Sequence, residues 1–339
     1  RTMGTDQKYH SDNMNLDYSS QQLSSEILKS LKSLVDENFK SVVITIPAMF
    51  NDNQKSATIE AANLAGFDQV ELLAEPIAAA TAFGVDEQVK DGNILVFDFG
   101  GGTFDVCLIS IEEGIMQVKD TGGDNWLGGK NLDEAIIDKI ILPWVKENYK
   151  IDSYLSDETK NAALNNSFKM YAESIKIGMS FDEVYEVQSD LEEFPNDDEG
   201  NEIELSFDVS SDDMKLAIGP VFQQAIDLTQ ELLKRNKLKG SDLASLILVG
   251  GPTFSPILRE MIKNQVCEPN IKVDPMTVVA RGAAIYASKF DIAEEIKDEY
   301  YFGMFFERVL TIFLIVNNVD YNITENEVTH NQLQSHPYY

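Results

Sequence analysis

Hydrophobic positions in the first part of the chain follow two periods, one typical of helices and one typical of strands. Apolar residues recur at helical spacing over residues 19–39, and Ser19 or Ser20 is suited to cap that helix. A β-branched run at 42–46, ended by a proline, predicts a buried strand. A second helix is predicted over 52–65, so this part of the chain alternates helices and strands.

The following segments lead from a strand through a helix to a hairpin. Residues 70–73 predict a strand, and 75–84 predict a helix with a proline just inside its start. After a polar boundary at 85–92, residues 93–111 predict two strands joined by a glycine-rich turn, and residues 116–119 continue the sheet.

The glycine-rich turn carries the first candidate chemistry. Asp98 lies near the end of the first strand, Gly100-Gly101-Gly102 follow, and Thr103 precedes the second strand. Glycine allows positive φ and close approach of another group. Such a turn points several backbone N–H groups into one concavity that suits phosphate oxygens, and an aspartate beside it suits a divalent cation. We interpret it as a phosphate-and-metal turn, although spacing alone favours an ordinary hairpin with a solvated aspartate.

The second half of the chain repeats part of this order. A buried strand at 246–249 runs into Gly250-Gly251 and then into a helix from about Ser255. Two further glycine pairs, at 122–123 and 128–129, suggest a flexible crossing between two lobes. The other long helices are predicted over 131–149, 158–178, 212–235 and 275–288.

Two polar or irregular segments interrupt the pattern. The acidic stretch from Asp190 to Glu204 lacks the alternating ligands and closing glutamate of a calcium loop, so we expect a solvated loop. After about residue 291 the character of the chain changes, with an aromatic and apolar part at 300–316 and no periodicity at 317–339.

Composition narrows the class of partner. The chain of 339 residues favours about two domains, and its 57 acidic and 27 basic residues give a net charge of −30. This balance argues against nucleic acid or an anionic membrane as the main partner. ATP is still compatible with it, because backbone N–H groups and Mg²⁺ hold the anion locally.

Cysteine, histidine and apolar runs exclude several other kinds of site. Cys107 and Cys267 lie in or near apolar segments, which favours buried reduced thiols over a disulfide framework. The three histidines lie near the chain ends, so a histidine-centred site is not expected. No leader pattern is present and the longest apolar run, 309–316, is too short to span a bilayer, so we expect a cytoplasmic protein.

Five separated motifs point to one family when they are taken in order. Together they resemble the ATPase domain of the DnaK-type seventy-kilodalton heat-shock chaperones, over about residues 19–290. Each motif alone is weak, but their order and spacing make the set specific. They are Ile46-Pro47-Ala48-Met49-Phe50-Asn51-Asp52, Glu75-Pro76-Ile77-Ala78-Ala79-Ala80, Phe97-Asp98-Phe99-Gly100-Gly101-Gly102-Thr103-Phe104-Asp105, Gly123-Asp124 with Leu127-Gly128-Gly129, and Leu248-Val249-Gly250-Gly251.

The resemblance implies an α/β, actin-like (ribonuclease H-like) ATPase fold of two lobes with ATP between them. It assigns residues 1–18 to a remnant of the first outer subdomain and 19–88 to a partial first inner subdomain. Residues 89–127 with 217–290 would form the second inner subdomain and 128–216 the second outer one. Residues 291–339 would be a divergent tail, and from about Tyr300 we expect it to depart completely from the family. It would be either a divergent helix or, as we favour from its composition, a truncated or frame-shifted end.

The resemblance also implies roles for individual residues around the turn. Glu75 would position the attacking water and the water shell of Mg²⁺, and Asp98 would be the metal-side carboxylate and proton acceptor. Gly100, Gly101, Gly102 and Thr103 would cradle the outer phosphates of ATP or ADP. Asp105 would help to hold a monovalent cation such as K⁺.

Further residues match the part of the family that contacts the nucleoside. Gly250 and Gly251 would pass close to the sugar and inner phosphates. Glu173, Lys176 and Ser180 match the helix that touches adenosine, and their spacing places them on one helical face. From the residues alone, Glu173 and Lys176 read as an ordinary surface pair, and Glu75 as an acid in a first helical turn.

Several departures from the family change the expected activity. The first phosphate loop, of Asp-Gly-Thr-Thr type, is absent, and so is the catalytic lysine before the segment matched by Arg1-Thr2-Met3-Gly4. The first lobe would therefore be incomplete, and we expect negligible ATP hydrolysis by this chain. Ile177 and Phe254 replace two arginines that usually stack on adenine, which suggests altered nucleotide preference.

Three functions fit these observations to different degrees. The first is the ATPase region of a chaperone that couples the nucleotide to client folding or release, with a J-domain co-chaperone and an exchange factor as partners. Client binding would need the peptide-binding domain that does not follow residue 290. The second is a non-catalytic, nucleotide-dependent interaction module. The third, another actin-fold protein such as a sugar kinase or filament protein, is disfavoured by the combination of motifs.

Overall fold

The computed structural model describes residues 2–11, 15–34, 39–87 and 91–288 of the chain. The chain divides into two compact units, one formed by residues 1–74 with 283–339 and the other by residues 75–282. The boundary falls inside the segment 19–88 that we expected to form one subdomain. The tail predicted over 291–339 lies outside the described residues.

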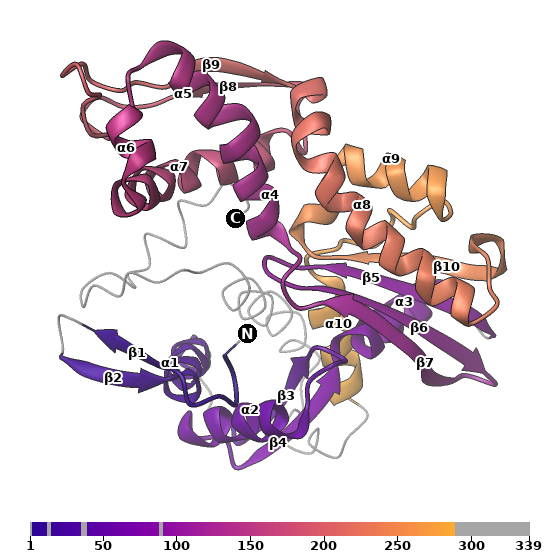
Figure 1. Ribbon diagram of the computed structural model, residues 1–339. Coiled ribbons are helices and arrows are strands. Elements are labelled where there is room, and N and C mark those ends of the chain that lie inside the picture. Colours follow the sequence, from indigo (N-terminus) through magenta and orange to yellow (C-terminus); the bar gives the residue numbers. More distant parts are fainter. Residues whose placement is uncertain (1, 12–14, 35–38, 88–90, 289–339) are drawn as a thin grey trace. The chain divides into compact units, whose positions relative to one another are not determined.

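The first unit combines a hairpin, two helices and a pair of parallel strands (Figure 1). Strands β3 and β4 pair in parallel from Ser41 opposite Gln69 to Ile46 opposite Ala74. The antiparallel β1–β2 hairpin was not predicted, because its residues are polar and exposed. The elements are β1 (Lys8–Ser11), β2 (Leu16–Ser19), α1 (Ser20–Lys32), β3 (Ser41–Ile46), α2 (Asp52–Leu64) and β4 (Gln69–Ala74).

The starts of both helices in this unit are fixed by capping boxes. Ser19 accepts a hydrogen bond from the backbone N–H of Gln22, and the Gln22 side chain accepts one from the Ser19 N–H, which confirms Ser19 as the N-cap of α1. The same reciprocal arrangement joins Asn51 and Gln54 at α2. Helix α2 therefore begins at Asp52, and its N-cap is the preceding residue, Asn51.

The second unit is built on a four-stranded sheet in the order β10-β5-β6-β7. Strand β10 is parallel to β5, whereas β5, β6 and β7 pair antiparallel. Helix α8 lies across one face of this sheet (Figure 1) and packs against β6 and β7. The strands are β5 (Gly92–Phe99), β6 (Phe104–Glu112), β7 (Ile115–Asp124) and β10 (Leu243–Val249), and α8 is Ser211–Arg235.

The remaining helices of the second unit have two kinds of neighbour. Helix α3 packs against strands of the four-stranded sheet, whereas α4, η1 and α7 pack against one another. The helix predicted over 131–149 is divided into three consecutive helical segments, and the middle one, η1 at Ile137–Ile141, is a π-helix. The short strands β8 and β9 pair antiparallel. The elements are α3 (Glu75–Glu87), α4 (Gly129–Ile136), α5 (Leu142–Asn148), α6 (Asp152–Ser156), α7 (Glu158–Gly178), β8 (Val184–Gln188), β9 (Ser206–Ser210), η2 (Gly240–Asp242), η3 (Gly251–Phe254), α9 (Pro256–Gln265) and α10 (Val278–Ala287), which runs on into the first unit.

Aromatic side chains fill the core where β5 and β6 meet α8. The ring centroids of Phe97 and Phe104 lie 4.7 Å apart, and those of Phe99 and Phe222 lie 5.5 Å apart in an edge-on contact. All four residues are fully buried. Burial of such rings contributes on the order of 2–3 kcal/mol each, so this cluster holds the hairpin and its glycine turn against the long helix.

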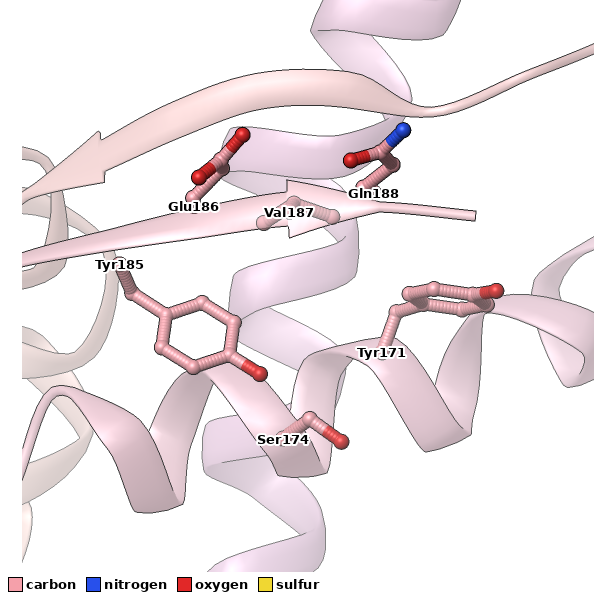
Figure 2. Close-up of a pocket in the computed structure, with 6 residues that line it drawn as sticks. All are labelled: Tyr171, Ser174, Tyr185, Glu186, Val187 and Gln188. Atoms are coloured by element: carbon pink, nitrogen blue, oxygen red, sulfur yellow. The ribbon is translucent and has the colours of Figure 1, made fainter. Parts of the chain in front are cut away.

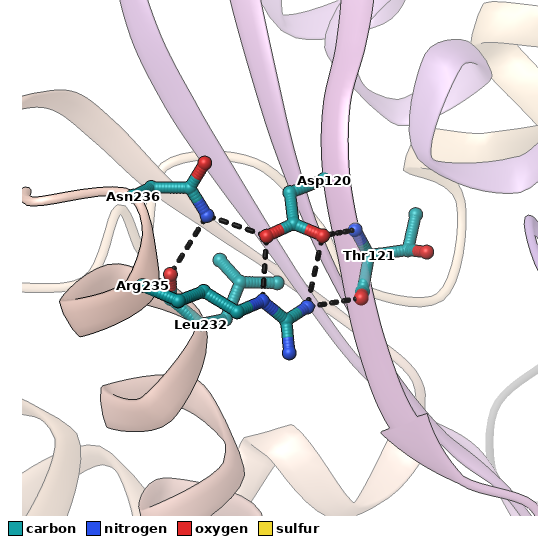
Figure 3. A network of polar contacts seen from close by, with 5 residues as sticks. All are labelled: Asp120, Thr121, Leu232, Arg235 and Asn236. Atoms are coloured by element: carbon teal, nitrogen blue, oxygen red, sulfur yellow. Dashed lines mark hydrogen bonds and ion pairs between the residues drawn. The ribbon is translucent and has the colours of Figure 1, made fainter.

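A polar network ties the edge strand β7 to the end of α8 (Figure 3). The Arg235 guanidinium donates to both carboxylate oxygens of Asp120, at 2.6 and 2.9 Å, and also to the Thr121 carbonyl. Asn236 donates to Asp120 at 2.6 Å and to the Leu232 carbonyl at 2.8 Å. The hydrogen bond that Asp120 accepts from Arg235 lowers the pKa of Asp120, so the charged carboxylate is the stable form in the folded chain.

One expectation about a loop needs correction, and the acidic stretch expected to be a solvated loop is mostly exposed. Gly122 and Gly123 are part of strand β7, opposite Val106 and Asp105, so they do not form a flexible crossing. Gly123 is required there because a Cβ atom would lie 2.3 Å from the Phe104 carbonyl oxygen. In the acidic stretch, Asp197 is buried and accepts backbone hydrogen bonds from Glu199 and Asn201, so the loop folds around this carboxylate.

Candidate functional site

Two of the predicted site carboxylates face each other across a strand pair. Asp98 on β5 is directly opposite Asp105 on β6 in the antiparallel register. Opposite residues of such a pair have Cβ atoms about 4.5–5.5 Å apart, and like charges at this separation destabilise the sheet. The repulsion between these two carboxylates therefore favours protonation of at least one of them.

Burial and mutual repulsion raise the pKa values of these groups. Burial raises the pKa of Asp105 to about 6, and burial together with the negative charge of Asp105 raises that of Asp98 to about 8. Glu75, the first residue of α3, joins them: burial and the fields of Asp98 and Asp105 raise its pKa well above the usual range. A cation beside the three carboxyl groups would reverse this effect by favouring their charged forms.

The glycine turn connects β5 and β6 next to this cluster. The Gly100 N–H donates to the Thr103 carbonyl at 2.9 Å and closes the turn. Within the described part of the chain, the N–H groups of Gly101 and Thr103 have no hydrogen-bond partner. Gly101 and Thr103 are partly exposed, and N–H groups in such a turn suit phosphate oxygens, so phosphate binding here stays a prediction.

The start of helix α4 holds the turn in place. The N–H groups of Gly129 and Lys130 donate to the carbonyls of Gly100 and Gly101, at 2.9 and 2.7 Å. A Cβ atom on Gly128 would lie 2.6 Å from the backbone of Gly102, so only glycine permits this approach. The pair Gly128-Gly129 thus allows the backbone at the start of α4 to pack closely against the backbone of the turn.

The other predicted glycine pair lies beside the same turn. Val249, the last residue of β10, aligns with Asp98, and Gly250 follows it. Gly250 has φ +91°, and a Cβ atom there would lie 2.3 Å from the Phe99 carbonyl oxygen. Gly251 then begins the short helix η3. The structure therefore brings Gly250 against the end of β5, where the phosphate turn begins.

The residues predicted to contact adenosine lie at the end of helix α7. Glu173 and Lys176 are on the helix, and Ser180 follows its last turn and donates to the Lys176 carbonyl at 3.0 Å. The reading of Glu173 and Lys176 as an ordinary surface pair is wrong, because the Lys176 ammonium donates to Asp133 of α4 at 2.6 Å. Burial raises the pKa of Asp133, and the lysine opposes this shift.

Phe254 has two neighbouring side chains that the sequence did not single out. Its ring centroid lies 5.9 Å from that of Phe181, and the Arg259 guanidinium carbon lies 5.4 Å from its ring centroid. Arg259 also donates to the Thr253 carbonyl at 2.8 Å. A guanidinium thus remains next to the position where the family usually has an arginine, although it comes from five residues further along the chain.

A separate pocket of about 340 Å³ lies between α7 and β8 and contains none of the predicted site residues. Figure 2 shows Tyr171 and Ser174 on the helix facing the strand residues Tyr185 to Gln188. A Cβ atom on Gly178 would lie 2.1 Å from the Tyr185 ring. The Tyr185 ring can therefore pack against the end of α7 only because residue 178 has no side chain.

The described residues contain neither a further metal-binding cluster nor a membrane-spanning helix. Among these residues no group of three or more histidine, cysteine, aspartate or glutamate side chains has the arrangement of a metal-binding cluster. No helix within the same ranges is both long and apolar enough to cross a membrane.

The strand–glycine–strand turn, the facing carboxylates and Gly250-Gly251 lie together in an α/β unit, and the comparisons give its class. The sequence matches the family described as Hsp70 protein over residues 3–323. It is also 35% identical over 292 residues to the chaperone protein DnaK of Nitrosopumilus maritimus (strain SCM1), which covers 85% of this chain and 44% of that protein. The chain belongs to the Hsp70 family and carries its DnaK-type, actin-like ATPase domain.

The extent of this match qualifies the expectation for the C-terminal segment. The family match continues to residue 323, beyond the last motif identified in the sequence. The expectation that the chain departs completely from the family at about Tyr300 is therefore wrong for residues up to 323. The chain spans less than half the length of the DnaK relative.

Proposed function

We propose that this chain binds ATP and ADP with Mg²⁺ and acts as the nucleotide-binding region of a DnaK-type chaperone. The observation that carries the proposal is the turn at 100–103, which presents the N–H groups of Gly101 and Thr103 beside Asp98. Donors for an anion and carboxylates for a cation thus lie next to each other, which is the combination that a magnesium nucleotide requires.

Each residue has a separate task in this proposal. The turn would bind the outer phosphates, and Gly250 with Gly251 would allow the sugar and inner phosphates to approach the backbone. Asp98 would face the Mg²⁺ ion and accept a proton, and Asp105 would favour a monovalent cation such as K⁺. Glu75 would orient the water that attacks the terminal phosphate. The family supports this assignment, because Hsp70 proteins use ATP or ADP and Mg²⁺.

Hydrolysis by the polypeptide itself is proposed to be very slow. The 339 residues contain no Asp-Gly-Thr-Thr loop. Phosphoryl transfer depends on charge stabilisation around the whole transferred group, so a single phosphate turn binds better than it catalyses. A non-catalytic, nucleotide-dependent interaction module of the same superfamily is the second candidate.

Partners and location follow from the family and remain part of the proposal. A DnaK-type protein would release unfolded clients in response to the bound nucleotide and would work with a J-domain co-chaperone and a nucleotide exchange factor. Client binding would need a peptide-binding domain. A cytoplasmic protein of the stress response fits this role, and the net charge of −30 argues against nucleic acid or an anionic membrane as a partner.

The proposal is tested by equilibrium binding of Mg·ATP to the whole chain and to two variants. Thr103→Val removes the turn hydroxyl, and Asp98→Asn removes the metal-side charge. Each is expected to weaken Mg·ATP binding by roughly tenfold, the effect of losing one hydrogen bond to a charged group. Asp182→Asn, an exposed carboxylate on the loop after α7, serves as the charge control. Equal affinity in all four proteins would reject the proposed site.

A further inference from the structure

Helix α4 contacts two parts of the candidate site that are far apart in the sequence. At its first turn, the N–H groups of Gly129 and Lys130 donate to the carbonyls of Gly100 and Gly101 in the phosphate turn. Four residues after Gly129, Asp133 accepts from Lys176 of α7. At a rise of 1.5 Å per residue, these two contacts are separated by about 6 Å along one rigid helix.

The ion pair between Asp133 and Lys176 is largely removed from solvent. The side chains are 18% and 15% exposed, and the oxygen–nitrogen distance is 2.6 Å. By contrast, both partners in pairs such as Lys29–Glu26 and Lys215–Glu260 are more than 40% exposed. A shielded pair holds its geometry better than a solvated one, because water does not compete for the donors.

The lysine retains donors after this bond is made. An ammonium group has three N–H donors, and Asp133 takes one of them. The Lys176 backbone is held as well, since its carbonyl accepts from the Ser180 hydroxyl at 3.0 Å. Lys176 is therefore fixed at both ends of its side chain, with N–H groups left to donate to a ligand.

We propose that Asp133 is a positioning residue that fixes the Lys176 ammonium for the nucleoside part of the nucleotide. The proposal rests on the proposed nucleotide-binding function. Its prediction is that removing Asp133 weakens the interaction with the nucleoside part of ATP and leaves the interaction with the phosphates alone nearly unchanged.

The test compares ATP with inorganic tripolyphosphate, which carries the phosphates without the nucleoside. Affinities of the full chain for both ligands, with Mg²⁺, are measured for the wild type, Asp133→Asn, Asp133→Glu and Lys176→Met. Asp133→Asn and Lys176→Met should each weaken ATP binding by roughly tenfold and tripolyphosphate binding by less than about twofold. Asp133→Glu should recover most of the ATP affinity, because it restores a carboxylate to the pair.

A double variant and a charge control separate positioning from a general loss of structure. If Asp133 acts through Lys176, the double variant that combines Asp133→Asn with Lys176→Met should bind ATP no more weakly than Lys176→Met alone. Asp138→Asn changes an exposed aspartate one helical turn further on and should leave both affinities unchanged. The melting temperature of each variant without ligand shows whether a lost affinity reflects unfolding.

The outcomes distinguish this inference from the proposed function. Wild-type binding of ATP with no effect of Asp133→Asn, or equal weakening of ATP and tripolyphosphate, would overturn the positioning role while the nucleotide site stands. Additive effects in the double variant would also contradict it. A wild-type chain that binds neither ligand would remove the proposed function, and the positioning role with it.

Discussion

Asp98 and Asp105 occupy directly opposite positions on the antiparallel strands β5 and β6, at the end of the hairpin that carries the phosphate turn. Their register is fixed by the buried apolar residues on both strands, so the two carboxyl groups cannot move apart by slipping along the ladder. The fold thus holds two acidic groups next to each other, and their repulsion destabilises the folded state when both are charged. A cation that bound between them would relieve this repulsion and so stabilise the fold.

The first prediction concerns stability against pH in the absence of nucleotide and Mg²⁺. The folded-state pKa of Asp105 is about 6 and that of Asp98 about 8, both above the usual value near 4, so the folded chain binds more protons than the unfolded chain over this range. The stabilising contribution is complete below pH 4 and is lost as the pH rises towards 8. For Asp105 alone the loss is about 3 kcal/mol.

Urea unfolding at pH 5 and pH 8 in the presence of a chelator measures this loss. Asp105→Asn should reduce the fall in unfolding free energy between the two pH values. The matched control is Asp182→Asn, an exposed aspartate outside the cluster, which should keep the wild-type slope. A wild-type unfolding free energy that rose from pH 5 to pH 8 would contradict the assignment.

The second prediction concerns the close approach at Gly250. A Cβ atom would lie 2.3 Å from the Phe99 carbonyl, and φ is +91°, so Gly250→Ala should destabilise the chain by more than about 1 kcal/mol and weaken ATP binding. Gly219 in helix α8 has open space at the same position. Gly219→Ala should have a smaller effect, because the gain in helix propensity of about 0.5–1 kcal/mol is opposed by the contact of the new Cβ with the following Pro220. Equal effects of the two substitutions in thermal unfolding would show that the approach is not required.

The third prediction concerns the link between β7 and α8. Arg235 and Asp120 form a two-point ion pair, but the side chains are 48% and 27% exposed, so solvent screens the interaction. Arg235→Met should therefore cost only about 1 kcal/mol in urea unfolding at pH 7. The cost should vanish as the pH falls through the lowered pKa of Asp120, because the protonated carboxyl no longer needs the guanidinium.

The control for this pair is Lys215→Met. Lys215 lies 3.8 Å from Glu260 in a more exposed pair, and its removal should change the unfolding free energy by less than about 0.5 kcal/mol. If the two substitutions had the same effect at every pH, the network of Figure 3 would contribute no more than a surface contact.

The fourth prediction concerns the choice of base. Phe254 has the Phe181 ring and the Arg259 guanidinium near it, and a stacked aromatic ring accepts any base through its π face. We expect GTP to compete with ATP within about tenfold in affinity, since apolar stacking discriminates bases weakly. Phe254→Ala should weaken both nucleotides together. Competition in which GTP failed to displace ATP at a hundredfold excess would contradict this expectation.

Local signals in the sequence were sufficient for much of the fold. The N-cap at Ser19, the turn at 100–103 and the strand leading to Gly250 were all identified from residue type and order, because capping and glycine chemistry act over a few neighbours. The hairpin β1–β2 was missed for the same reason: its exposed polar residues carry no periodic apolar signal.

Contacts between segments that are far apart in the sequence could be predicted less well from the sequence. The sequence indicates that Asp98 and Asp105 flank one turn, but their opposite placement depends on the register of the whole hairpin. Asp133 gave no signal of its own, because its partner Lys176 is 43 residues away on another helix. The glycines at 122–123 were assigned to a crossing because glycine in a strand is uncommon unless another backbone passes close by.

The most direct test of the nucleotide site follows the backbone amides of the turn by NMR while Mg·ATP is added to the whole chain. We predict saturable shifts at Gly101 and Thr103, and unchanged signals at Gly114 and Gly200, which lie in turns with open space around them. Absence of shifts in the turn, or shifts confined to the pocket between α7 and β8, would contradict this prediction.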